Sequence, residues 1–180
     1  MSRIDTGREF IPIGIAVLTV SDTRAPGDDR SGDTLAGRIE TAGHRLAARA
    51  IVRDEQPEIE TQLRAWIADP AIDAVLSTGG TGLTGRDVTV EAHRAVYEKE
   101  IDAFATVFTQ VSMAKIGTSA VQSRACAGVA GGTYLFALPG SPSACRDAWD
   151  EILVLQLDYR HRPCNFVEIM PRLEEHRRRK

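Results

Sequence analysis

IDAVLSTGGTG, residues 72–82, is the stretch of this sequence that says most about the fold. Its first half is a short apolar run, which is typical of a strand buried on both faces of a sheet. Its second half is a loop of small residues, in which glycine lets backbone N–H groups approach an anion and Thr78 and Thr81 add hydroxyl donors. The stretch therefore predicts a buried strand that runs into an anion-binding loop, although a tight turn without a ligand would use the same residues.

Strands and helices alternate on both sides of this loop. Apolar runs predict further strands at 11–20, 46–52 and 134–138. Apolar residues at helical spacing predict helices at 33–42, 57–69, 89–100 and 101–115, the third with Thr89 as its N-cap, and another that opens at Ser141 and Pro142. The alternation predicts one α/β domain with a mainly parallel sheet at 11–160, between a flexible N-terminus at 1–10 and a C-terminal extension at 161–180.

The composition is that of an ordinary globular protein, with 43% hydrophobic and 26% charged residues. The formal net charge of -3 provides no overall positive field for a phosphate backbone, which argues against general nucleic-acid binding. Residues 125–145 carry no charge, but glycines and prolines divide them into loop, strand and turn, so no membrane segment is predicted. The N-terminus resembles no signal peptide and three cysteines suggest no disulfide framework, so the cytoplasm is the expected compartment.

Four unusual turns follow the predicted strands. They are SDT (21–23), RDE (53–55), TGGTG (78–82) and PGSP (139–142). Open α/β sheets bind ligands outside the carboxyl ends of their strands, where loop amides and helix N-termini gather. We therefore expect these four turns to converge on one ligand site.

Two nucleotide-binding motifs fit the glycine loop poorly. GTGLTG (80–85) has the spacing of a Walker A loop, but Arg86 and Asp87 stand where Lys and Ser or Thr would contact phosphates and magnesium. The GxGxxG spacing is also present, yet it follows the third predicted strand and opens no ordinary dinucleotide-binding unit. An unrelated nucleotide hydrolase is therefore a distant alternative.

Asp54 and Asp87 are each open to two interpretations. Asp87 is either a favourable charge at a helix N-terminus or a magnesium ligand, and Asp54 is either a solvated loop residue or a second magnesium ligand. Ser123 and Arg124 offer a hydroxyl and a guanidinium suited to phosphate. The four histidines lack metal-ligand spacing and are predicted to be surface or structural residues, and the chain ends at 6–8 and 177–180 to be solvated.

Read together, these motifs resemble the MoaB and MogA family of molybdenum cofactor biosynthesis proteins, which is related to the gephyrin G domain. The resemblance covers about residues 12–158, and the sequence around 117–141 together with RPCNF (162–166) resembles the MoaB branch. The motifs that carry it are AVLTVSDTR (16–24), RSGDTL (30–35), STGGTGLTGRDVTVEA (77–92), SR (123–124) and LPGSPSA (138–144).

The resemblance implies a three-layer α/β/α sandwich with a mostly parallel central sheet and a site for molybdopterin, a pterin dithiolene with a terminal phosphate. Active relatives join that phosphate to AMP from Mg-ATP and release pyrophosphate. Carried over by motif, the resemblance implies that Asp54 and Asp87 hold Mg²⁺ and that Ser123 lies beside the adenylyl group. It implies a larger set that binds the substrates: Ser21, Asp22, Thr78, Gly79, Gly80, Thr81, Gly82, Arg124, Pro139, Gly140, Ser141, Pro142 and Ser143.

Two hypotheses for function follow from the resemblance. The first is a molybdopterin adenylyltransferase, and the second is a noncatalytic molybdopterin-binding or carrier protein of the same pathway. The second is motivated by the MoaB-like tail and by Gly85, which stands where the family usually has Pro and loosens the approach to Asp87. The resemblance also implies a homo-oligomer, either a trimer or a hexamer of two trimers, with the longer C-terminus favouring the hexamer.

Overall fold

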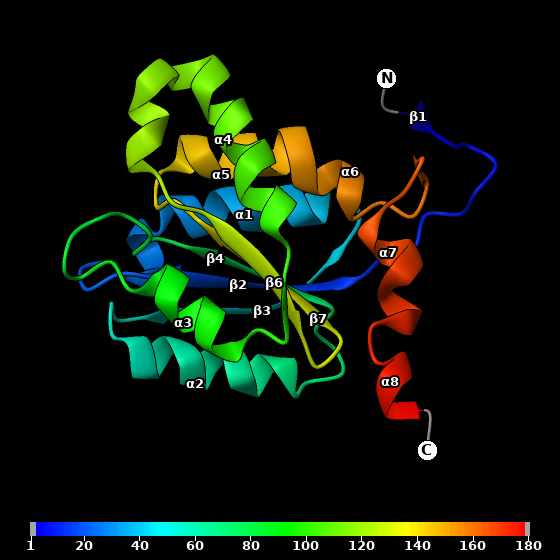
Figure 1. The fold of residues 1–180 in the computed structure, drawn as a ribbon, viewed down its shortest axis with the longest axis horizontal. Coiled ribbons are helices and arrows are strands. Elements are labelled where there is room, and N and C mark those ends of the chain that lie inside the picture. The colour runs from blue at the N-terminus through cyan, green and yellow to red at the C-terminus, as the bar shows by residue number, and fades with distance from the viewer. Residues whose placement is uncertain (1–2, 179–180) are drawn as a thin grey trace.

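A six-stranded sheet forms the centre of the computed structural model, which describes residues 3–178 (Figure 1). Its strand order is β3-β2-β4-β7-β6-β5. The first four strands in this order are parallel to one another, whereas β6 is antiparallel to β7 and β5 is antiparallel to β6. The bounds are β2 (Gly14–Val20), β3 (Arg45–Val52), β4 (Ala74–Thr78), β5 (Lys99–Glu100), β6 (Cys126–Ala130) and β7 (Thr133–Leu138).

Helices cover both faces of this sheet. In Figure 1, α2 and α3 lie on one face and α1, α4 and α5 on the other. The bounds are α1 (Arg30–Thr41), α2 (Gln56–Ile67), α3 (Thr89–Val96), α4 (Asp102–Ile116), α5 (Pro142–Ala148), α6 (Val154–Gln156), α7 (Phe166–Ile169) and α8 (Glu175–Arg178). Short 3-10 helices occupy Pro26–Asp28, Gly117–Gln122 and Met170–Arg172.

Alternate residues of β2 face two separate cores. Ile15 and Val17 lie in one core with side chains from α1, α4 and α5, whereas Ala16 and Leu18 lie in the other with side chains from α2 and α3. Because both faces of the strand are buried, its sequence is a continuous apolar run rather than an alternating one. The predicted three-layer α/β/α sandwich with a mostly parallel sheet is therefore confirmed.

The segment between α3 and β7 differs from the prediction. The helix predicted over 89–100 ends at Val96, because Tyr97 is extended and the chain continues into β5. The antiparallel strand β6 was not predicted, since Gly128 at its centre is a weak strand former. Gly128 is nevertheless required there: a Cβ atom would lie 2.4 Å from the ring of Tyr97.

Two helix details also differ. Thr89 is not an N-cap, because α3 already begins at this residue and its Oγ1 donates instead to the carbonyl of Gly79 at 2.7 Å. After α5 a π-helical turn at Trp149–Leu153 shifts the buried face. Leu153 is therefore fully buried, whereas Leu155 is only partly buried.

The two ends of the described chain pair with each other. Strand β1 (Arg3–Ile4) is antiparallel to β8 (His161–Arg162), so residues predicted as a flexible N-terminus and as a C-terminal extension share a small sheet. Arg8 is not simply solvated as predicted: its Nη1 donates to the carbonyl of Tyr159 at 2.8 Å and its guanidinium lies over the Tyr159 ring. At the other end, Arg177 forms ion pairs with Glu98 and Glu174, and Arg179 and Lys180 of the basic run fall outside the described residues.

None of the described helices is long and apolar enough to cross a lipid bilayer.

Candidate functional site

The parallel strands end in register at one edge of the sheet. Val20 of β2 pairs with Val52 of β3, Thr19 with Thr78 of β4, and Thr78 with Leu138 of β7. The residues that follow these strands are those of the SDT, RDE, TGGTG and PGSP turns. The predicted convergence of the four turns is therefore correct at the level of the backbone.

The glycine loop depends on backbone shapes that other residues rarely adopt. Gly79 and Gly80 have φ angles of +98° and +62°. A Cβ atom on Gly79 would lie 2.3 Å from the carbonyl oxygen of Val20, and one on Gly80 would lie 2.6 Å from Oδ1 of Asp54. The loop therefore packs directly against the end of β2 and against the Asp54 carboxylate.

A small cavity of about 230 Å³ opens beside this loop. Four predicted residues line it, namely Ser21, Thr78, Gly79 and Gly140. The TGGTG and PGSP turns meet here, since a Cβ atom on Gly140 would lie 3.1 Å from Cα of Gly79. The remaining lining residues were not assigned a role from the sequence: Thr19, Val20, Thr23, Arg24 and Ser31.

Ser31 and Arg24 are the most informative of the missed residues. Ser31 is the second residue of α1, and its hydroxyl donates to the carbonyl of Gly140 at 2.6 Å, which ties α1 to the PGSP turn. Arg24 is partly exposed, and its Nη1 donates to the carbonyl of Asp28 at 2.7 Å. Both residues lie in motifs that carry the family resemblance, AVLTVSDTR and RSGDTL, and these motifs are the sequence signal that could have found them.

Asp22 and Asp54 form a hydrogen-bonded pair beside the glycine loop. The backbone N–H of Asp22 donates to Asp54 Oδ2 at 2.9 Å, and that of Asp54 donates to Asp22 Oδ1 at 3.2 Å. Burial and the negative charge of Asp22 raise the pKa of Asp54, whereas hydrogen bonds from Arg86 lower the pKa of Asp22. The negative charges of its neighbours therefore favour a cation beside the Asp54 carboxylate.

Asp87 packs against the same loop at Gly82. Its Oδ2 accepts hydrogen bonds from the backbone N–H and the hydroxyl of Thr84, at 2.8 Å and 2.6 Å. The Thr84 hydrogen bonds lower the pKa of Asp87, which keeps this carboxyl ionised. A Cβ atom on Gly82 would lie 2.8 Å from Asp87 Oδ2, so the glycine allows the carboxylate to pack against the loop. The charge of Asp87 also raises the pKa of Asp54.

The guanidinium of Arg124 donates hydrogen bonds to backbone carbonyls of the glycine loop and of the segment that follows it. Its Nε donates to the carbonyls of Thr81 and Gly82 at 3.0 Å and 2.9 Å, and its Nη2 donates to the carbonyl of Asp87 at 3.1 Å. Its guanidinium also pairs with Glu91. The structure therefore shows Arg124 holding the loop that carries Asp87, and Ser123 lies next to it in the chain.

Three predicted residues lie at the beginning of α5. Ser141 is the N-cap, as predicted, and its hydroxyl accepts from the backbone N–H of Ala144 at 3.1 Å. Pro142 follows as the first helical residue, and Ser143 Oγ lies 3.2 Å from Ser141 Oγ. Ser141 is exposed and borders Gly140, which lines the small cavity. The two serines therefore lie beside that cavity without lining it themselves.

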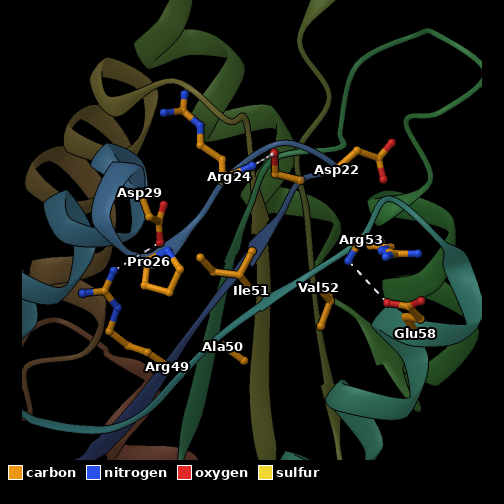
Figure 2. Close-up of a pocket in the computed structure, with 11 residues that line it drawn as sticks. Asp22, Arg24, Pro26, Asp29, Arg49, Ala50, Ile51, Val52, Arg53 and Glu58 are labelled. Carbon is orange, nitrogen blue, oxygen red and sulfur yellow. Dashed lines mark hydrogen bonds and ion pairs between the residues drawn. The ribbon is translucent and has the colours of Figure 1, made fainter.

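A second, larger cavity of about 730 Å³ adjoins the first along the edge strand β3 (Figure 2). Figure 2 shows Arg49 reaching the buried carboxylate of Asp29, which it meets at 3.1 Å. Ser21 and Arg24 line both cavities. The other lining residues are Asp22, Pro26, Asp29, Arg49, Ala50, Ile51, Val52, Arg53 and Glu58. Of these, Arg53 belongs to the predicted RDE turn, whereas the others from Pro26 onward were given no role from the sequence.

The histidines and cysteines form no metal site in the part of the chain that the structure describes. No group of three or more His, Cys, Asp or Glu side chains there is arranged to hold a metal ion. His44, His93 and His161 are buried and His176 is exposed, in agreement with the predicted surface or structural roles. Burial lowers the pKa of His93 to about 3, so its imidazole is neutral between Ser77 and Tyr97.

Gly85 lies in an open part of the loop. A Cβ atom there would meet nothing within 4 Å, and its φ angle lies outside the positive range that favours glycine. The departure from the family's Pro at this position is therefore not forced by backbone geometry or by a close neighbour.

Known proteins resemble this chain in both sequence and fold. A family model described as "Probable molybdopterin binding domain" matches residues 16–159. Molybdenum cofactor biosynthesis protein B of Escherichia coli (strain K12) is 49% identical over 166 residues, which cover 92% of this chain and 96% of that protein.

Two solved structures are similar along most of their length. A crystal structure of a Molybdenum cofactor biosynthesis protein B has a TM-score of 0.83 at 34% identity and covers 94% of this chain and 99% of that one. The tungsten cofactor synthesizing protein MoaB from Pyrococcus furiosus has a TM-score of 0.71 at 34% identity, covering 79% of this chain and 91% of that one. This chain therefore belongs to the MoaB and MogA family of molybdenum cofactor biosynthesis proteins, which share a molybdopterin-binding domain.

Proposed function

We propose that this protein binds molybdopterin and adenylylates its terminal phosphate with Mg-ATP. The observation that carries the proposal is the arrangement at the carboxyl edge of the sheet. A cavity lined by Gly79, Gly140 and hydroxyl-bearing side chains lies beside the glycine loop, and the Asp54 carboxylate packs against Gly80 of the same loop. A phosphate and a metal-bound phosphate would thus be held by neighbouring parts of one loop.

The smaller cavity suits the terminal phosphate. Its walls include the hydroxyl groups of Ser21 and Thr23, and Arg24 supplies a positive charge. The hydroxyls of Ser31 and Thr78 also line it, but in the free protein they donate to the carbonyls of Gly140 and Pro139. Gly79 and Gly140 line the cavity with backbone alone, so an anion there would meet no side chain at these two positions. The adjoining cavity along β3 supplies room for a ring system beyond the phosphate.

The carboxylates suit Mg²⁺, which prefers one or two carboxylates together with substrate phosphates. Asp54 and Asp87 would hold it, since Asp54 Oδ1 faces Gly80 and accepts no hydrogen bond from any residue within 3–178. The raised pKa of Asp54 reflects burial and negative neighbours, which a bound cation would offset. When bound, Mg²⁺ would neutralise charge on the nucleotide phosphates and on the leaving pyrophosphate.

The proposed reaction needs positioning more than proton transfer. An oxygen of the molybdopterin phosphate forms a bond to the α-phosphorus of ATP, and the bond from that phosphorus to the bridging oxygen breaks. The electron pair leaves with pyrophosphate, and no oxidant or reductant is consumed. Ser123 and the loop held by Arg124 would lie beside the adenylyl group.

The alternative is a noncatalytic molybdopterin-binding or carrier protein. It is favoured by the loop at 83–86, where residues are exposed and Gly85 replaces a stiffer Pro. An unrelated nucleotide hydrolase is a distant third choice, because Arg86 and Asp87 stand where a Walker motif has Lys and Ser or Thr.

Incubating the protein with molybdopterin, ATP and Mg²⁺ separates these functions. We expect adenylylated molybdopterin and pyrophosphate by mass spectrometry, and neither product when Mg²⁺ is omitted. Tight molybdopterin binding without turnover would favour the carrier. Release of phosphate or pyrophosphate from ATP in the absence of molybdopterin would favour the hydrolase.

We also propose that the protein is a trimer or a hexamer. Large apolar side chains are exposed along one segment, the end of α4 and the 3-10 helix after it, and subunit contact would bury them. They are Met113, Ile116 and Val121, of which Val121 is 76% exposed. Light scattering of the purified protein should give three or six times the mass of one chain, and a monomeric mass would contradict the proposal.

A further inference from the structure

Arg86 connects three of the loops at the carboxyl edge of the sheet. It lies in the loop between β4 and α3, and its guanidinium donates to both carboxylate oxygens of Asp22, with distances of 2.8 Å, 3.0 Å and 3.1 Å. Its Nη1 also donates to Glu55 Oε1 at 2.8 Å. Arg86 thus joins the loop that carries Asp87 to the SDT and RDE turns.

The positive charge of Arg86 lies against the acidic group proposed for the metal. Arg86 holds Asp22 in a bidentate contact, and the backbone N–H groups of Asp22 and Asp54 each donate to the carboxylate of the other residue. Glu55 follows Asp54 in the chain, and its carboxylate accepts the hydrogen bond from Arg86 Nη1. In the free protein, one arginine therefore partly neutralises three neighbouring carboxylates.

The ion pairs of Arg86 with Asp22 and Glu55 are exposed and contribute little to the stability of the fold. The side chains of Arg86, Asp22 and Glu55 are 55%, 40% and 50% exposed. Exposed ion pairs contribute little to folding stability, because water solvates both partners nearly as well. The guanidinium can therefore leave these carboxylates without unfolding the loops.

We propose that Arg86 is a positioning residue that serves as the counter-ion of Asp22, Asp54 and Glu55 in the free protein and competes there with Mg²⁺. This inference rests on the proposed function, because it concerns the same metal site. Repulsion between the cation and the guanidinium displaces Arg86 when Mg-ATP arrives. Its N–H donors then become available to the nucleotide phosphates, with which a planar guanidinium forms bidentate contacts.

Mn²⁺ binding to the free protein tests this role, with unbound Mn²⁺ counted by electron paramagnetic resonance. Mn²⁺ is a suitable probe because it takes the same oxygen ligands as Mg²⁺. We expect Arg86→Gln to bind Mn²⁺ about fivefold more tightly than the wild type, since a nearby positive charge is removed. Arg86→Lys keeps that charge and should remain close to the wild type. Structural damage alone would weaken binding, so a gain in affinity is specific to the proposed role.

Arg94→Gln is the matched control. Arg94 is also 55% exposed and makes a two-nitrogen contact with one carboxylate, that of Glu100 on β5. Its loss should leave Mn²⁺ affinity unchanged. Unchanged or weaker Mn²⁺ binding in Arg86→Gln would overturn the counter-ion role.

Asp54→Asn separates failure of this inference from failure of the proposed function. If Asp54→Asn removes Mn²⁺ binding while Arg86→Gln has no effect, the metal site stands and the role of Arg86 is wrong. If Mn²⁺ binds and Asp54→Asn leaves that binding unaltered, the metal site itself is wrong and the role of Arg86 falls with it. If no variant of the free protein binds Mn²⁺, the competition between Arg86 and the cation is wrong, whereas a site completed by nucleotide phosphates still stands.

Discussion

Asp54→Asn is expected to lower the rate of molybdopterin adenylylation by roughly 10²–10³-fold, because it removes a charged ligand from the proposed metal site. The amide oxygen can still accept the hydrogen bond from the backbone N–H of Asp22. The substitution also removes a negative charge beside Asp22 and Asp87, whose repulsion contributes to the raised pKa of Asp54. The free energy of unfolding should therefore not fall. Single-turnover kinetics and chemical denaturation measure the two quantities on the same sample.

Two further measurements make this prediction specific. Molybdopterin affinity should change little in Asp54→Asn, since the phosphate cavity is lined by other residues. Glu40→Gln is a suitable control, because Glu40 is an exposed carboxylate in α1 that lines neither of the two cavities. A rate loss in Asp54→Asn no larger than that of Glu40→Gln would refute the metal-binding role.

Gly79→Ala is expected to lower the free energy of unfolding by about 3 kcal/mol or more, because two costs combine. The φ angle of +98° is unfavourable for alanine, and the new methyl group would lie 2.3 Å from the carbonyl oxygen of Val20. That oxygen belongs to backbone at the end of a buried strand, so it cannot move aside cheaply. Thermal and urea denaturation measure the loss.

Gly37→Ala is a control that should change the free energy of unfolding in the opposite direction. Gly37 lies within α1, and a Cβ atom there would meet nothing within 4 Å. Alanine is a better helix former than glycine, so this substitution should raise the free energy of unfolding by up to about 1 kcal/mol. Equal effects at the two glycines would show that the glycine loop is not packed against β2 as described.

The arrangement of the candidate site was predictable because it depends on local signals. Each parallel strand is an apolar run that ends in an unusual turn, and parallel strands of one sheet place those turns at one edge. Knowing only that Asp54 follows one strand and Thr78 ends another, we could infer that their loops lie close together. The contact between Gly80 and the Asp54 carboxylate has this origin.

Other features depend on residues distant in the sequence and were not predictable. Strand β6 contains Gly128, which weakens the strand signal and is explained only by the ring of Tyr97 above it. The guanidinium of Arg124 looks suited to phosphate in the sequence, yet it binds loop carbonyls more than 40 residues away. The contacts of Ser31 with Gly140 and of Arg86 with Asp22 are likewise set by tertiary packing.

The central claim is that this site transfers an adenylyl group to molybdopterin. A single-turnover reaction with protein in excess over molybdopterin, in the presence of Mg²⁺ and ATP labelled at the α-phosphorus, tests it most directly. The account predicts that the label enters molybdopterin with an equal amount of pyrophosphate released, and that Asp54→Asn slows both. Molybdopterin that stays bound and unlabelled, with no pyrophosphate formed, would contradict it.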